Sequence, residues 1–145
     1  MVWRALAWML AATGLALGGG CRLESDGSPV GAARMFLQAT RRGNCARAFA
    51  VFSTQRREAI QAEFSRKARK GYREVSEFYC LPAPHNPYTT MDPSTAGGTG
   101  VALEPHTALV RVEGTDATGS PILWTLVMVD EGGKWRVHNV NPAAP

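Results

Sequence analysis

The first half of the chain spaces its apolar residues three and four positions apart, which is the repeat of one face of an α-helix. A first helix is expected to begin at Ser28, whose side chain can cap it, with Pro29 at the first helical position. Gly43 is placed to end this helix. The positions expected on its buried face are Val30, Ala33, Phe36, Leu37 and Thr40.

Two shorter helices are expected to follow. Asn44 can cap the second helix and Thr54 can cap the third, because both side chains can accept a hydrogen bond from a free backbone N–H. The positions expected in the core are Ala48, Phe49 and Phe52 in the second helix and Ile60, Phe64 and Ala68 in the third.

The second half of the chain changes to a period of two, which is typical of β-strands. Residues 81–100 are rich in Pro, Gly and Thr, so a long loop that holds at most a short strand is expected there. Strands are expected over residues 107–113, 122–129 and 134–140, with a hairpin turn at 130–133. Because ILWTLVMV at 122–129 is apolar on both faces, it is expected inside its sheet. The chain therefore predicts an α+β fold, with N-terminal helices packed on a curved antiparallel sheet.

The first 20 residues show a different pattern. Residues 5–17 form an uncharged apolar run behind Arg4. A helix of that length rises only about 20 Å, less than the roughly 30 Å of hydrocarbon in a bilayer. With small residues after it, the run indicates a secretory signal peptide over residues 1–20. The stretch LALGGGC then ends at Cys21.

This ending resembles the lipobox of bacterial lipoproteins, with Gly19 and Gly20 at the small positions before Cys21. The resemblance implies cleavage before Cys21 and acylation of this residue, which would attach the chain to a lipid bilayer. Residues 21–27 are then a tether and residues 28–145 the domain. The alternative is ordinary cleavage after Gly18 or Gly20, which would leave a soluble protein.

The residue after the cysteine bears on where the anchor would lie. Such lipoproteins are retained at the inner membrane of some bacteria by an Asp at this position, and this chain has Arg22. The resemblance therefore implies a lipid-anchored protein of the bacterial cell envelope, at the outer membrane and facing the periplasm.

The chain has three cysteines, an odd number that would leave one thiol over in an oxidising compartment. If Cys21 carries lipid, Cys45 and Cys80 remain and can pair. Such a disulfide would close a loop of about 35 residues and stabilise the fold by about 3–4 kcal/mol. The alternative is two buried free cysteines.

Charge is divided unevenly along the chain, although the total is only +4. Residues 41–73 hold ten basic residues against two acidic ones, a charge of +8, whereas residues 74–145 hold three against eight, a charge of −5. Such a basic run usually covers a solvated helix surface. The alternative is attraction to anionic lipid headgroups near the anchor. An exported protein seldom meets nucleic acid, so no nucleic-acid partner is expected.

Two stretches resemble domains of the nuclear transport factor 2-like family, which also includes ketosteroid isomerase and polyketide cyclases. They are SPVGAARMFLQATRRGNCARAFAVFS at the start of the domain and PILWTLVMVDEGGKWRVHNV near its end. The resemblance extends from Ser28 to Asn141. It implies a cone in which the curved sheet wraps around the first helix and can leave a pocket between them.

An isomerase-type enzyme would need ionisable side chains in such a pocket. Helical spacing assigns Phe36 to the pocket or core, and the alternation along the strands assigns to it Val110, Trp124 (or, in the alternative, Leu123), Leu126, Met128, Trp135 and Val137. The neighbouring inward positions are Ala108, Val112 and Asn139. None of these is Asp, Glu, His or Tyr, which indicates a packed core or an apolar binding cavity.

The expected function is therefore that of a non-catalytic envelope domain that binds a partner protein or a small apolar ligand. The alternative is a small cofactor-free enzyme of the isomerase or cyclase type, whose carboxylate comes from a helix or from the 81–100 loop. The available carboxylates are Glu63, Glu74, Glu77 and Asp92. In the same loop, His85 and Tyr88 could accompany Asp92 under a lid.

Other candidate sites are weaker. His138 is expected on the outer face of the sheet, near Glu113 and Arg111. Four possible zinc ligands occur at unusual spacings, namely Cys45, Cys80, His85 and His106. The glycines of residues 97–100 lack the Lys and the following helix of a phosphate-binding loop. No metal and no cofactor is therefore expected.

Overall fold

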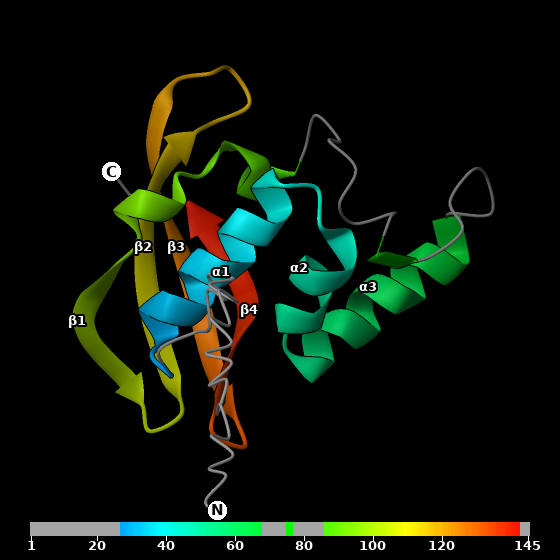
Figure 1. Ribbon diagram of the computed structural model, residues 1–145, viewed down its shortest axis with the longest axis horizontal. Coiled ribbons are helices and arrows are strands. Elements are labelled where there is room, and N and C mark those ends of the chain that lie inside the picture. Colours follow the sequence, from blue (N-terminus) through cyan, green and yellow to red (C-terminus); the bar gives the residue numbers. More distant parts are fainter. Residues whose placement is uncertain (1–26, 68–74, 77–85, 143–145) are drawn as a thin grey trace, which may run out of the picture.

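A computed structural model describes residues 27–67, 75–76 and 86–142 of the chain (Figure 1). Three α-helices come first: α1 (Pro29–Arg41), α2 (Cys45–Val51) and α3 (Thr54–Lys67). Two short 3₁₀ turns, η1 (Pro87–Thr90) and η2 (Pro93–Thr95), follow before the sheet. The strands are β1 (Gly97–Glu104), β2 (Thr107–Thr115), β3 (Pro121–Glu131) and β4 (Lys134–Pro142). No helix in these described ranges is long and apolar enough to cross a bilayer.

The helix caps expected at Ser28 and Asn44 are confirmed. Ser28 Oγ accepts a hydrogen bond from the backbone N–H of Gly31 at 2.9 Å, and Asn44 Oδ1 accepts one from that of Arg47 at 3.2 Å. Gly43, directly after the cap residue of α1, has a φ of 68° that favours glycine. The residues at its two ends, Ser28 and Gly43, thus set where α1 begins and ends.

The expected cap of α3 is wrong by one residue. Ser53 Oγ accepts a hydrogen bond from the backbone N–H of Arg56, and Ser53 O accepts one from that of Arg57. Thr54 instead donates its N–H and its hydroxyl to the carboxylate of Glu131, at 2.8 and 3.1 Å. The first turn of α3 is therefore attached to the β3–β4 hairpin.

The four strands form one antiparallel sheet in the order β1-β2-β3-β4. The fold is thus α+β, with helices packed against an antiparallel sheet. Strand β3 has a neighbour on each side, as its apolar sequence predicts. The end of the expected loop, from Gly97 onward, belongs to the edge strand β1. Figure 1 shows α1 across one face of the sheet, with α2 and α3 beside the β4 edge.

The core lies between α1 and this face of the sheet. Helix α1 contributes Ala33, Phe36 and Leu37, each with no exposed surface. The sheet contributes Val110, Val112, Leu126, Met128 and Val137, which are equally buried. Paired positions of neighbouring strands, such as Val110 and Leu126, therefore share the same inner face.

Strand β4 interrupts its alternation at His138. Met128 pairs with Val137 whereas Val127 pairs with Asn139, so β4 contains one extra residue, a β-bulge. The expectation that Asn139 points inward is therefore wrong: it is exposed, and Val140 packs against the core. His138 does not lie by Glu113 and Arg111 either, because it contacts Ser53 on the helix side.

Candidate functional site

The space between α1 and the sheet is occupied by aromatic side chains. The rings of Phe36 and Tyr88 meet edge to face with centroids 4.9 Å apart, and those of Phe36 and Phe52 are 5.0 Å apart. All three residues are at most 2 % exposed. Edge-to-face pairs at this distance are in contact, which indicates a packed interior at this place.

The seven residues assigned to a pocket or core all lie at this interior. Phe36, Val110, Leu126, Met128 and Val137 have no exposed surface. Trp124 and Trp135 are half-buried and pack against the core.

Tyr88 belongs to this interior although the sequence places it in a loop. Asn86 Oδ1 accepts a hydrogen bond from the backbone N–H of Tyr88, which shapes η1 and turns the phenol inward. Burial raises the pKa of Tyr88 above its usual value, and the charge of Arg56 offsets part of the rise. A phenol with a raised pKa is a weaker proton donor, so Tyr88 is poorly suited to stabilise an oxyanion. The sequence signal for its position is the Asn86-Pro87 pair, since both residues favour a tight turn.

Ser53 and His138 form a pair that sequence reasoning missed. Ser53 Oγ lies 2.9 Å from His138 Nδ1, a distance found in serine nucleophiles with their base. However, Ser53 is only 1 % exposed and its Oγ also accepts the N–H of Arg56. A hydroxyl so enclosed cannot reach a substrate, so the pair joins α3 to β4.

The carboxylates of the enzyme alternative do not meet in the interior as far as the structure describes them. Asp92 is exposed, and its Oδ1 accepts hydrogen bonds from Ser94 N–H at 2.9 Å and Ser94 Oγ at 2.8 Å. The Ser94 hydroxyl, then its N–H, hold the pKa of Asp92 below its usual value, against a small effect of burial. Glu63 is half-buried on α3, and Glu74 and Glu77 lie outside the described residues.

The remaining candidates are separated. The side chain of His106 is 78 % exposed, with Nδ1 3.8 Å from Asp130 Oδ2. His85 falls outside the described residues. Within the described ranges, no three His, Cys, Asp or Glu side chains are placed to hold a metal ion.

Cys45 is disulfide-bonded. Cys21 and Cys80 both lie outside the described residues, so the Cys45–Cys80 pairing and the acylation of Cys21 stay predictions.

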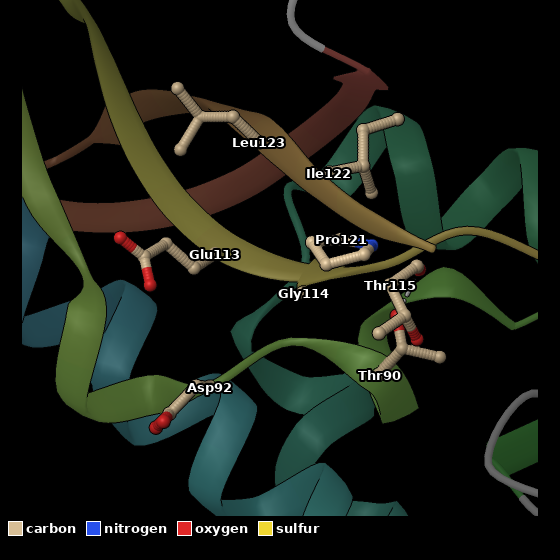
Figure 2. Close-up of a pocket in the computed structure, with 8 residues that line it drawn as sticks. All are labelled: Thr90, Asp92, Glu113, Gly114, Thr115, Pro121, Ile122 and Leu123. Atoms are coloured by element: carbon tan, nitrogen blue, oxygen red, sulfur yellow. Dashed lines mark hydrogen bonds between the residues drawn. The ribbon is translucent and has the colours of Figure 1, made fainter. Parts of the chain in front are cut away.

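A hollow of about 510 Å³ lies where the η1–η2 segment runs beside the β2–β3 hairpin. We call it the hairpin groove, and it is open to solvent. Its lining residues, drawn in Figure 2, are Thr90, Asp92, Glu113, Gly114, Thr115, Pro121, Ile122 and Leu123.

Hydrogen bonds fix one wall of the hairpin groove to the other. The N–H of Asp92 donates to Glu113 O at 2.8 Å, and the N–H of Glu113 donates to Thr95 Oγ1 at 2.9 Å. The hydroxyl of Thr90 donates to Thr115 O at 2.8 Å. The η1–η2 segment is thus bonded to β2 at Glu113 and Thr115.

Gly114 permits this close approach. A Cβ atom at Gly114 would lie 2.9 Å from Thr90 O and 3.1 Å from Met91 Cα, both of which are backbone atoms. The 2.9 Å contact is shorter than real Cβ atoms show, so the backbone at Thr90 would have to shift, and the 3.1 Å contact would also be tight. Glycine is therefore required at this position for the η1–η2 segment to pack against β2.

The groove combines apolar and acidic side chains. Leu123 is 36 % exposed. No other large hydrophobic side chain among the described residues is as exposed. Glu113, its cross-strand partner, is also exposed. Figure 2 shows Glu113 between Leu123 and Asp92, with the Asp92 carboxyl group directed away from Leu123.

Comparison with known proteins finds no family model, no curated protein and no solved structure that matches this chain.

Proposed function

We propose that this chain is a lipid-anchored domain of the bacterial cell envelope that binds a partner protein and catalyses no reaction. The observation that carries this proposal is the contrast between the interior and the surface. The interior is closed by Phe36, Phe52 and Tyr88, whereas the hairpin groove presents an exposed Leu123 beside two carboxylates. A surface of this kind suits a protein partner better than an enclosed small molecule.

The proposed fold is the nuclear transport factor 2-like cone. Support comes from the resemblance of residues 28–141 and from the position of α1 across one face of the antiparallel sheet. The bulge at His138 adds support, because bulges increase the bend of a strand.

The proposed anchor is acylated Cys21, followed by a tether at residues 21–27. Seven extended residues reach at most about 25 Å, so the start of α1 would stay near the bilayer. Helix α1 has 13 residues and rises about 20 Å along its axis. Its last residue, Arg41, lies 3.8 Å from Asp92, so the hairpin groove is beside the end of α1 that is farther from the tether. A groove in this place remains accessible to a protein in the periplasm.

The same geometry bears on the basic segment. Arg41, Arg42 and Arg47 are exposed where α1 ends and α2 begins, again at the far end of α1 from the tether. We therefore favour a solvated surface over contact with anionic headgroups for these three arginines.

The test is to express the full-length chain and extract it from membranes with non-ionic detergent. The intact mass of the extracted protein is measured. In a second sample, bound proteins are cross-linked to it before extraction and isolated with it. The expected mass is that of a chain starting at Cys21 with added acyl groups, less two hydrogens for one disulfide between Cys45 and Cys80. A partner polypeptide is expected to co-isolate. An uncut soluble chain would refute the anchor. Turnover abolished by one substitution in the interior, such as Tyr88→Phe, would refute the non-catalytic function.

A further inference from the structure

The exposed apolar surface of the hairpin groove is fixed in place. Pro121, Ile122 and Leu123 of β3 are paired with Thr115, Gly114 and Glu113 of β2. The opposite wall is bonded to β2 through the backbone of Asp92 and Glu113. A partner that binds here meets a surface that needs little reorganisation, which lowers the entropic cost of binding.

Two carboxylates, those of Asp92 and Glu113, line the hairpin groove. The hydrogen bonds from the Ser94 hydroxyl and N–H lower the pKa of Asp92 and so favour its charged form. The carboxylate of Glu113 has no hydrogen bond or ion pair with any described residue. Arg41 Nη1 lies 3.8 Å from Asp92 Oδ1, but both side chains are about half exposed, so this pair is screened by water.

The open shape of the groove decides between kinds of occupant. A small molecule is normally held in a pocket that covers most of its surface, whereas this hollow is open to solvent. A polypeptide segment can instead lie across an open groove and insert a single side chain. The exposed Leu123 provides the apolar contact for that side chain.

We propose that the hairpin groove binds a segment of a partner protein in which one large apolar side chain is flanked by lysine or arginine. The apolar side chain packs on Leu123 and Pro121, which share one face of β3, and the flanking cations face Asp92 and Glu113. This inference rests on the proposed function, because it names the site and the partner chemistry of a binding domain.

The probe is a fluorescein-labelled peptide with one central Leu flanked by two Lys on each side and a Gly at each end, measured by anisotropy against the full-length chain in non-ionic detergent. A second peptide replaces every Lys with Glu, and a third replaces the Leu with Ser. The first peptide is expected to bind at least about tenfold more tightly than either control, and more weakly as salt rises. Equal binding of the Glu peptide would overturn the inference.

Two substitutions test the groove itself. Glu113→Gln removes one charge and Leu123→Thr removes the apolar contact while keeping a residue that suits a strand. Each is expected to weaken binding of the Lys-Leu peptide by about 3- to 10-fold, the effect of about 1 kcal/mol. The matched controls are Glu58→Gln on α3 and Leu109→Thr on the same sheet face, and both should bind as the unmodified chain does.

The outcomes separate this inference from the proposed function. If a partner co-isolates equally with the unmodified chain and with the Glu113→Gln and Leu123→Thr variants, the groove assignment is wrong and the binding function stands. If no polypeptide co-isolates with the unmodified chain, the proposed function fails first. If the groove substitutions abolish self-association of the chain instead of peptide binding, the occupant is a second copy and the inference is also wrong.

Discussion

The hydroxyl of Ser53 and Nδ1 of His138 lie 2.9 Å apart and join the start of α3 to the bulge of β4. The same segment is bonded at the backbone, where Ser53 N–H donates to Val137 O at 2.9 Å and Phe52 forms an isolated parallel bridge with Val137. The extra residue in β4 turns His138 toward the helices, so the bulge and the helix cap depend on each other.

Replacing Ser53 with alanine should therefore destabilise the fold. Ser53→Ala removes the cap of α3 and the partner of His138, and we expect a loss of about 2 kcal/mol in the free energy of unfolding. Urea unfolding at neutral pH measures this loss. The control is Ser65→Ala, whose exposed hydroxyl bonds only to Gln61 O within α3. If both variants unfold at the same urea concentration, the Ser53–His138 contact contributes nothing.

The bulge also explains where prediction from sequence failed. The alternation of Trp135 and Val137 was correct, but it was extended to Asn139 as if β4 were regular. The sequence did contain a signal, because the next apolar residue after Val137 is Val140, three positions on and not two. A strand that buries both residues on one face must contain an extra residue between them.

Helix starts were predictable because a cap is a local event. Ser28 and Asn44 bond to N–H groups three residues ahead, so a few letters contain the whole cause. Tyr88 was different, because its burial depends on a four-residue 3₁₀ turn that is too short to show periodicity. The hairpin groove also had no sequence signal, since Asp92 and Glu113 are 21 positions apart and meet only through the sheet.

Burial of Tyr88 predicts a loss of stability at alkaline pH. Its pKa is raised in the folded state, so below about pH 10 the phenol is protonated both folded and unfolded and stability is unaffected. Above that pH the unfolded chain releases the proton first, and the free energy of unfolding falls as pH rises. The limiting slope is about 1.4 kcal/mol per pH unit for one proton.

Urea unfolding of the unmodified chain and of Tyr88→Phe between pH 8 and pH 11 tests this. The Phe variant should lose less stability across the range, because it has no phenol to ionise. Parallel curves for the two proteins would show that Tyr88 does not hold its proton more tightly when folded.

Two surface carboxylates, those of Asp92 and Asp116, are expected to titrate independently in acid. Asp92 is bonded by Ser94, and Asp116 accepts from the hydroxyl of Thr118 at 2.6 Å, its largest stabilising contact. Both pKa values are lowered, so each carboxylate supports the fold above its usual pKa and loses that effect as pH falls through its lowered value.

Carboxyl chemical shifts followed by NMR through an acid titration give both pKa values in one sample. Ser94→Ala should raise the pKa of Asp92 and leave that of Asp116 unchanged, and Thr118→Ala should do the reverse. Each variant is thus the control for the other. A common shift of both residues in either variant would mean that the local hydrogen bonds are not the cause.

Substitution of Gly114 is expected to displace one wall of the hairpin groove. In Gly114→Ala the new Cβ would lie 2.9 Å from Thr90 O, 3.0 Å from Trp124 Cδ1 and 3.1 Å from Met91 Cα, so the η1–η2 segment must move away from β2. We expect a loss of about 1–3 kcal/mol in the free energy of unfolding, measured with urea. Hydrogen exchange of the Asp92 amide should also become faster, because its bond to Glu113 O is stretched.

The matched control is Gly98→Ala in β1, where the nearest atom to a new Cβ is Val30 Cγ2 at an ordinary 4.0 Å. Its stability should change by less than about 0.5 kcal/mol, because the added methyl group meets no backbone and the unfolded chain loses some freedom. If Gly114→Ala and Gly98→Ala behave alike and the Asp92 amide stays protected, the η1–η2 segment is not packed as closely as these distances require. In that case the groove would be adaptable, and a partner would have to order it on binding, at the cost of affinity.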